Sequence, residues 1–201
     1  MNIAETLRLA LISAALALPL ATPAAAQEQS AEETAFEPGE PYLAATHRDW
    51  EVLCTRFEVD EPEVCEMYQL LIDGEQNPIA EISIAALPPG NNAAEGLVAG
   101  ATITTPLETF LPTGLGWRVG DVETMRVEGF RTCTVVGCFA RIGFNTEEVE
   151  VMKRGSHAIV TIAPFVAIDQ PIDIRVSLLG FTAALEDLQA RLPAPDAAPQ
   201  D

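Results

Sequence analysis

The sequence predicts a mainly β fold, an antiparallel β-sandwich or barrel of about nine strands. The first observation is a series of short runs in which apolar and polar residues alternate, as in half-buried strands. The second is that Pro, Gly or Asn separates these runs at short intervals. The third is that helical spacing is confined to two segments, a short one near residues 146–154 and one over 181–192.

The chain ends predict export and a single folded domain. Residues 1–26 hold an apolar run followed by small residues at Ala24 and Ala26, which is typical of a secretory signal peptide. The run is shorter than the roughly 20 apolar residues of a membrane-spanning helix, although a weak basic flank keeps an uncleaved anchor open as an alternative. We therefore expect an exported protein, periplasmic or at the cell surface, with no membrane span.

Three further regions follow the signal peptide. Residues 27–46 are acidic and lack periodicity, so they predict a flexible leader. Residues 47–192 predict one β domain, because about 150 residues suffice for one core. Residues 193–201 are rich in Pro and Ala and predict a disordered tail.

The expected strands occupy nine segments, in which Trp50 and Trp117 alternate with other apolar residues and are therefore expected in the core. In chain order these segments are 49–57, 64–72, 78–87, 97–105, 116–123, 124–133, 137–144, 157–164 and 171–180.

The two helices have recognisable ends. Thr146 is the expected N-cap of the first helix, Glu147 and Glu148 lie in its first turn, and Gly155 ends it. The second helix ends at Pro193, and an apolar stripe predicts that it packs on the sheet. The stripe comprises Phe181, Ala184, Leu185, Leu188 and Leu192.

The cysteines predict two local disulfides, Cys54–Cys65 and Cys133–Cys138. An even number of cysteines in an exported chain favours disulfides, and their spacing fits neither a C-x-x-C redox motif nor a zinc site. Gly137 suits a hairpin turn between Cys133 and Cys138, and the turn-prone segment 60–63 lies between Cys54 and Cys65. The two cysteines of each pair would then face each other across the two strands of a hairpin.

Composition and motifs argue against several function classes. The chain holds 30 acidic and 11 basic residues, and its net charge of −19 disfavours nucleic acid or an anionic lipid surface as a partner. The sequence contains no G-x-S-x-G, no Gly-rich phosphate loop and no H-E-x-x-H motif. We expect no cofactor, no metal ion and no catalytic residues. His157 is expected to be structural and His47 to be solvated.

Partner sites are expected in loops. The acidic cluster Asp60, Glu61 and Glu63 lacks the spacing of a calcium loop and is expected to be a solvated hairpin tip. Segments 87–96 and 105–114 are the first places where we expect recognition, because loops on a rigid β scaffold commonly bind partners.

The order of several short motifs resembles the invasion-associated locus B family of exported bacterial proteins, over roughly residues 48–190. In chain order these motifs are W-x-V-x-C (50–54), C-x-M-x-Q (65–69), TTPL (104–107), LPTGL (111–115), C-x4-C (133–138) with Gly137 before its second cysteine, and VSLLGFTAAL (176–185). The resemblance implies an envelope protein whose relatives are linked to host-cell invasion, and it implies no chemistry.

Together, these features predict a non-enzymatic module that binds or supports an unknown envelope or host protein, in an unknown oligomeric state. The alternative is a hydrolase of envelope polymers that uses two carboxylates, which requires one carboxyl group with a raised pKa in a cleft.

The disulfide hypothesis is tested by peptide mapping of the mature protein without reduction. We expect Cys54 in one peptide pair with Cys65, and Cys133 in another with Cys138, because each pair spans one hairpin. A map in which Cys54 is joined to Cys133 or Cys138 contradicts the two-hairpin argument.

Overall fold

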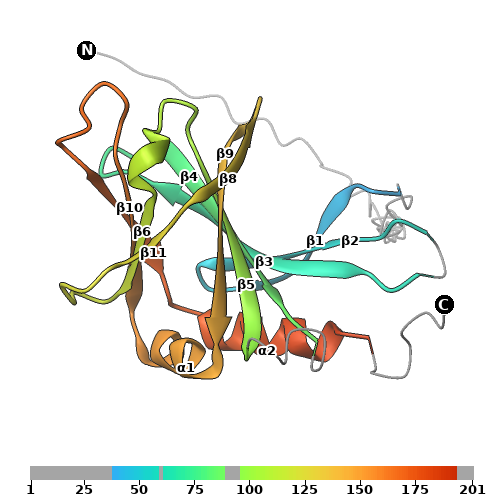
Figure 1. Cartoon of the computed structure of the whole chain (residues 1–201). Coiled ribbons are helices and arrows are strands. Elements are labelled where there is room, and N and C mark those ends of the chain that lie inside the picture. Colours follow the sequence, from blue (N-terminus) through green and yellow to red (C-terminus); the bar gives the residue numbers. More distant parts are fainter. Residues whose placement is uncertain (1–37, 59–60, 89–95, 194–201) are drawn as a thin grey trace, which may run out of the picture. The chain divides into compact units, whose positions relative to one another are not determined.

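Two antiparallel sheets and two helices make up the described part of the computed structural model, which comprises residues 38–58, 61–88 and 96–193 (Figure 1). The strands are β1 Pro41–His47, β2 Trp50–Thr55, β3 Val64–Ile72, β4 Pro78–Ala86, β5 Leu97–Thr105, β6 Leu115–Val119, β7 Arg126–Glu128, β8 Phe130–Thr134, β9 Gly137–Asn145, β10 His157–Ile162 and β11 Ile172–Ser177. A 3₁₀ turn covers Leu111–Thr113, and the helices are α1 Thr146–Arg154 and α2 Phe181–Arg191.

The strands form a seven-stranded sheet in the order β1-β2-β3-β4-β5-β9-β8 and a four-stranded sheet in the order β11-β10-β6-β7. All neighbouring strands in these two sheets pair in antiparallel fashion. The sheets do not close on each other, so the sandwich alternative of the predicted fold class is confirmed and the barrel alternative is not.

The core lies between the sheets and is built by residues that alternate along each strand. β2 buries Trp50 and Val52, and β9 buries Ala140, Ile142 and Phe144, with the intervening side chains turned outward. Trp117 of β6 contacts Phe144 with ring centroids 5.4 Å apart, which joins the two sheets. The prediction that both tryptophans belong to the core is confirmed.

Helix α1 begins one residue away from the predicted position of its cap. Asn145, not Thr146, is the N-cap, because its side chain accepts a hydrogen bond from the Glu148 N–H at 2.9 Å. The Glu148 carboxylate in turn accepts from the Asn145 N–H at 2.9 Å, which completes a capping box. Gly155 is the C-cap, as predicted.

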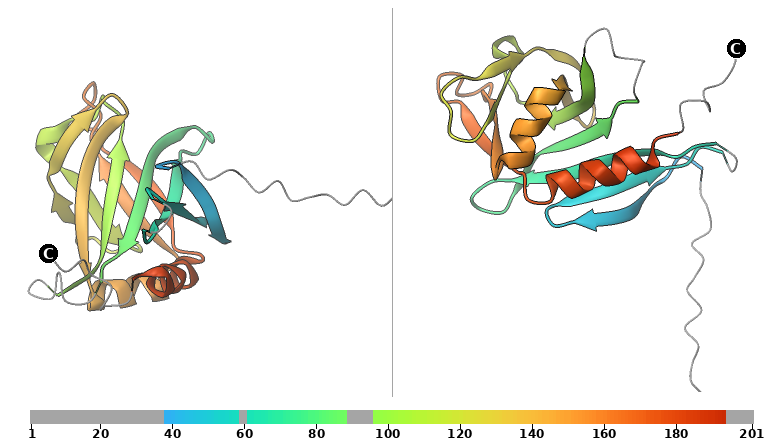
Figure 2. Two further views of the ribbon diagram at one scale, coloured as in Figure 1. Left: turned by 90° about the vertical axis from the view of Figure 1, so that its right-hand side faces the viewer. Right: turned by 90° about the horizontal axis from the view of Figure 1, so that it is seen from below.

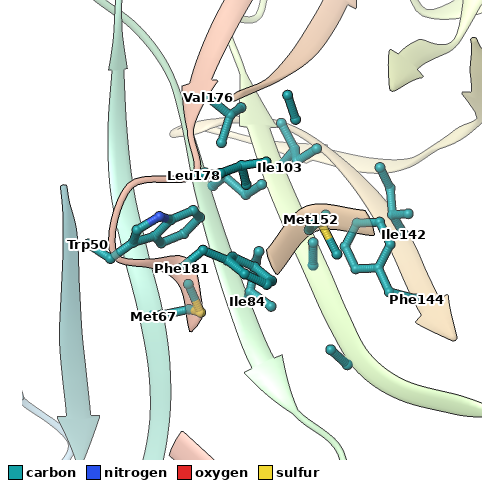
Figure 3. Close-up of a cluster of buried hydrophobic side chains, with 14 of the residues drawn as sticks. Trp50, Met67, Ile84, Ile103, Ile142, Phe144, Met152, Val176, Leu178 and Phe181 are labelled. Atoms are coloured by element: carbon teal, nitrogen blue, oxygen red, sulfur yellow. The ribbon is translucent and has the colours of Figure 1, made fainter. Parts of the chain in front are cut away.

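Helix α2 packs its apolar stripe against the strands at one end of the sheets, and α1 lies at the same end (Figure 2). Phe181 meets Trp50 edge to face with ring centroids 6.0 Å apart, and Figure 3 shows both rings in the buried cluster. Ala184, Leu185 and Leu188 are buried beside Phe181. None of the helices in the described ranges is long and apolar enough to cross a bilayer.

The strand pattern differs from the sequence prediction in two places. Residues 41–46, expected in the flexible leader, belong to β1, which pairs from Pro41 opposite Thr55 to His47 opposite Trp50. Most side chains of β1 are exposed, so the strand is stabilised mainly by backbone hydrogen bonds. Its sequence therefore lacks the alternation of apolar and polar residues that would have predicted a strand. The signal peptide, most of the leader and residues 194–201 lie outside the described residues.

The second difference concerns residues 124–133, which were expected to form one strand. The chain divides at Gly129, so that β7 joins the four-stranded sheet and β8 joins the seven-stranded sheet. This division and the additional strand β1 together give eleven strands in the described residues, rather than about nine.

The Gln69 side chain joins the two sheets. Its Nε2 donates to the carbonyl oxygens of Asp49 at 2.9 Å and Ser177 at 3.2 Å, and its Oε1 accepts from the Ser177 N–H at 2.8 Å. Trp50 Nε1 donates to the same Ser177 carbonyl at 3.0 Å. Because Gln69 lies on β3 and Ser177 ends β11, these hydrogen bonds, here called the Gln69 clamp, fix one sheet relative to the other.

Gly180 lets the chain pass closely over the clamp into α2. Its φ of +92° is the left-handed conformation that favours glycine, and a Cβ at this position would lie 1.9 Å from the His47 carbonyl oxygen. The Asp49 N–H donates to the Leu179 carbonyl at 3.3 Å, so the turn between β1 and β2 is bonded to the segment that leads into α2.

Replacing Leu185 by Asp should destabilise the domain by about 3 kcal/mol or more, because it places an unpaired carboxylate in the core. Thermal unfolding measures the effect. Ala183→Asp is the matched control, since it adds the same charge to the exposed face of α2. If Leu185→Asp melts within about 2 °C of the wild type, the helix is not docked as described.

Replacing Gln69 by Leu should lower the free energy of unfolding by about 2–4 kcal/mol, because it removes the side-chain partner of partly buried hydrogen bonds to the Ser177 and Asp49 backbone groups. Urea unfolding provides the measurement. Gln189→Leu makes the same change at an exposed position of α2 and should alter stability by less than about 0.5 kcal/mol. Equal losses in the two variants contradict the role assigned to the clamp.

Candidate functional site

Most cationic side chains in the described residues are neutralised by a carboxylate. Ion pairs involve Arg56, Arg118, Arg126, Lys153, Arg154 and Arg191. Within the described ranges, the arginines without an ion pair are Arg48, Arg131, Arg141 and Arg175. In a chain of net charge −19, arginines without a carboxylate partner are informative about binding.

Arg131 and Arg141 line the same recess on the outer face of the seven-stranded sheet. The recess has a volume of about 610 Å³, and its other lining residues are Thr102, Thr132 and Phe139. The left view of Figure 2 shows the neighbouring strands β5, β9 and β8 that carry these residues. We call this feature the arginine recess.

Strand register explains most of this arrangement. Thr102 of β5 lies opposite Arg141 of β9, and Phe139 of β9 lies opposite Thr132 of β8. All four belong to the outward set of their strands, because the alternate positions of β9, such as Cys138 and Ala140, are buried.

Arg131 reaches the recess because β8 is bulged. Phe130 pairs with Ala140 and Thr132 pairs with Phe139, so β8 has one more residue than β9 over this step. Arg131 is the extra residue, and a bulge changes the direction in which a side chain points. Without the bulge, the consecutive residues Arg131 and Thr132 would face opposite sides of the sheet.

The tip of the β8–β9 hairpin is held firmly beside the recess. Cys133 and Cys138 are opposite each other in the register and joined by a disulfide. Gly137, at φ +152°, lies so close to β5 that a Cβ would be 2.6 Å from the Thr105 carbonyl oxygen. Thr105 Oγ1 also donates to the Cys138 carbonyl at 3.3 Å. The strands that carry the recess are therefore fixed to one another.

The arginine recess has the chemistry of an anion-binding site. Two guanidinium groups offer planar sets of N–H donors that suit carboxylate, phosphate or sulfate oxygens. The Thr102 and Thr132 hydroxyls can add further hydrogen bonds, and the Phe139 ring supplies an apolar wall. Its lining residues offer binding groups rather than a nucleophile with an adjacent base.

A serine, a histidine and an aspartate meet elsewhere in the fold. Ser156 Oγ lies 3.1 Å from His157 Nδ1, and His157 Nε2 lies 3.2 Å from Asp121 Oδ1. The Asp121 side chain is 95% exposed, whereas the aspartate of a catalytic triad is buried behind the histidine. His157 is buried and hydrogen-bonded, as expected of a structural histidine.

Several carboxyl groups have displaced pKa values, and the displacement is downward. Hydrogen bonds from Tyr42 and Arg56 lower the pKa of Glu63, and those from Arg191 and His47 lower the pKa of Asp187. A hydrolytic acid requires the opposite direction. These groups therefore give no support to the paired-carboxylate alternative.

The cysteines are joined in the two pairs that the hairpin argument predicts, Cys54 with Cys65 and Cys133 with Cys138. The Glu63 carboxylate lies with the Cys54 and Cys65 sulfurs inside a 4.8 Å group that a metal ion could otherwise occupy. Because a zinc ligand is a thiolate and both sulfurs are in a disulfide, this group does not suit zinc.

Two polar residues differ from their expected roles. His47 is not simply solvated, because its Nε2 lies 2.9 Å from Asp187 Oδ2 on α2. Glu63 is not part of a free acidic tip, since it accepts hydrogen bonds from Tyr42 and Arg56. Asp60 and most of loop 87–96 lie outside the described residues.

The arginine recess was not predicted from the sequence. Arg141 could have been placed on the outward face by strand alternation, but the bulge that adds Arg131 leaves no signal in a single sequence. The predicted recognition segment 105–114 lies beside the recess strands without lining it.

Comparison with known proteins gives one consistent result. The family described as invasion associated locus B (IalB) protein matches residues 50–189. Invasion protein B homologs from two Brucella abortus strains, 2308 and biovar 1 strain 9-941, are each 29% identical over 152 residues, covering 76% of this chain and 82% of each relative. The crystal structure of invasion associated protein B from Bartonella henselae matches with a TM-score of 0.61 and 22% identity, covering 74% of this chain and 96% of that one.

Proposed function

Because this chain belongs to the invasion associated locus B family, as the order of its motifs predicted, we propose that it is an exported binding module of the bacterial envelope or cell surface. In this proposal the arginine recess holds an anionic group of the partner, and no bond is made or broken. The names of the relatives refer to invasion, so a host-cell molecule and an envelope component are both suitable carriers of the anionic group.

A single observation carries the proposal: Arg131 and Arg141 share one recess, and neither has an ion-pair partner among the described residues. Two guanidinium groups on neighbouring strands repel each other, and an oxyanion between them relieves that repulsion. Charge-assisted hydrogen bonds from arginine are also among the strongest that a surface can offer. The two disulfides support a location in an oxidising compartment.

The proposal is tested by isothermal titration calorimetry, in which inorganic phosphate or sulfate is added to the mature protein at low salt. The double variant Arg131→Gln, Arg141→Gln should weaken phosphate binding by at least about tenfold, because each lost charge-assisted hydrogen bond contributes about 1.5 kcal/mol or more.

The matched control is Arg48→Gln, Arg175→Gln, which removes the same charge from arginines outside the recess that also form no ion pair with any described residue. This control should bind phosphate within about twofold of the wild type, apart from the weak effect of net charge. Equal losses in the two double variants, or no saturable binding by the wild type, contradict the proposal.

A further inference from the structure

A second recess adjoins the arginine recess on the same face of the sheet. It has a volume of about 360 Å³, and apolar atoms dominate its wall. Leu70, Ile79, Pro106 and Val136 are among its lining residues, together with Glu81 and Thr104. We call it the apolar recess.

The two recesses are separated by a single cross-strand pair. Thr104 of β5 lines the apolar recess, Phe139 of β9 lines the arginine recess, and these residues are directly opposite each other. From β8, which carries Arg131, to β4, which carries Glu81, there are three strand spacings, or about 14 Å. A ligand of that length can occupy both recesses by lying across the strands.

Aliphatic side chains of the apolar recess are open to solvent. Leu70 is 50% exposed and Val136 is 73% exposed, although both belong to a rigid sheet or its stapled hairpin. Apolar surface beside a polar recess is typical of a ligand site in which one part of the ligand is apolar.

The two ends of this surface carry opposite charges. Arg131 and Arg141 lie at one end, and the Glu81 carboxylate lies at the other, where it accepts a hydrogen bond from the Tyr68 hydroxyl at 3.0 Å. Burial and this hydrogen bond raise the pKa of Tyr68 to about 12, so the phenol stays protonated as a donor. An anionic head group is therefore attracted to the arginines and repelled from the apolar recess.

We infer that the two recesses form one site for an amphipathic anion, with a phosphate, sulfate or carboxylate head between Arg131 and Arg141 and an aliphatic chain across Phe139 into the apolar recess. This inference rests on the proposed function and adds the chemical class of the ligand. Charge complementarity sets the head at the arginine end, and the exposed Leu70 and Val136 contact the chain.

The experiment compares inorganic phosphate with butyl phosphate and octyl phosphate, each below its micelle concentration. Octyl phosphate should bind at least about tenfold more tightly than phosphate, because burial of even a few methylene groups exceeds that factor. Octyl glucoside, which has the same chain and a neutral head, and octylamine, which has a cationic head, should bind more weakly than octyl phosphate.

Variants separate the two recesses. Leu70→Ser should remove most of the affinity that octyl phosphate gains over phosphate. The affinity for phosphate itself should stay within about twofold of the wild-type value. The double variant Arg131→Gln, Arg141→Gln should weaken the binding of both phosphate and octyl phosphate. Ile172→Ser, at an exposed aliphatic residue of β11 in the other sheet, is the matched control and should change neither. Circular dichroism and melting temperature establish that each variant is folded.

Each contrary result has a distinct meaning. If phosphate binds through the arginines but octyl phosphate binds no more tightly, the inference is wrong and the proposed function stands. If octyl phosphate binds in a way that depends on Leu70 and not on the arginines, both are wrong. Tighter binding of octylamine than of octyl phosphate overturns the assigned direction of the ligand.

Discussion

The hydrogen bonds of the Gln69 side-chain amide set the position of one sheet on the other, and much of the remaining structure depends on that position. Gln69 binds the backbone of Ser177 from across the sandwich, and the Trp50 indole donates to the same carbonyl. Ser177 leads through Gly180, whose missing Cβ allows close contact with His47, into α2 and Phe181, which closes over Trp50. Three of the motifs that predicted the family, those at 50–54, 65–69 and 176–185, thus meet at one place, and their role there is architectural. This explains how their order along the chain can be characteristic without indicating a reaction.

Local patterns predicted the parts of the fold that local physics determines. Alternation placed Trp50 and Trp117 in the core, and turn residues between cysteines predicted the hairpins that the structure contains. The edge strand β1 was missed because exposed side chains give it no apolar period. The clamp was missed because it joins residues 108 positions apart, and the arginine recess because a bulge decides where Arg131 points. Long-range pairing and bulges depend on the whole sheet, so they cannot be predicted from the sequence of a single strand.

The distribution of charge connects the fold to the proposed function. The chain carries 30 acidic and 11 basic residues, and carboxylates neutralise most of the described cations. Arg131 and Arg141 differ because the sheet holds them together on its outer face, beside threonine hydroxyls and an aromatic ring. In the proposed function, such a site would recognise an anion by geometry and charge, which is consistent with a binding module in a family whose name refers to invasion. In the further inference, the aliphatic side chains of the adjoining apolar recess contact the apolar part of the same ligand.

The most direct measurement of the central claim, that the arginine recess is the binding site, follows the arginine Nε–Hε resonances by NMR during a titration with phosphate. If Arg131 and Arg141 hold the anion together, their signals should shift saturably with one common dissociation constant, while the signals of Arg48 and Arg175 move little. Shifts of similar size at all four arginines, or none that saturate, would contradict it, because they would mean that phosphate senses only the overall charge of the protein.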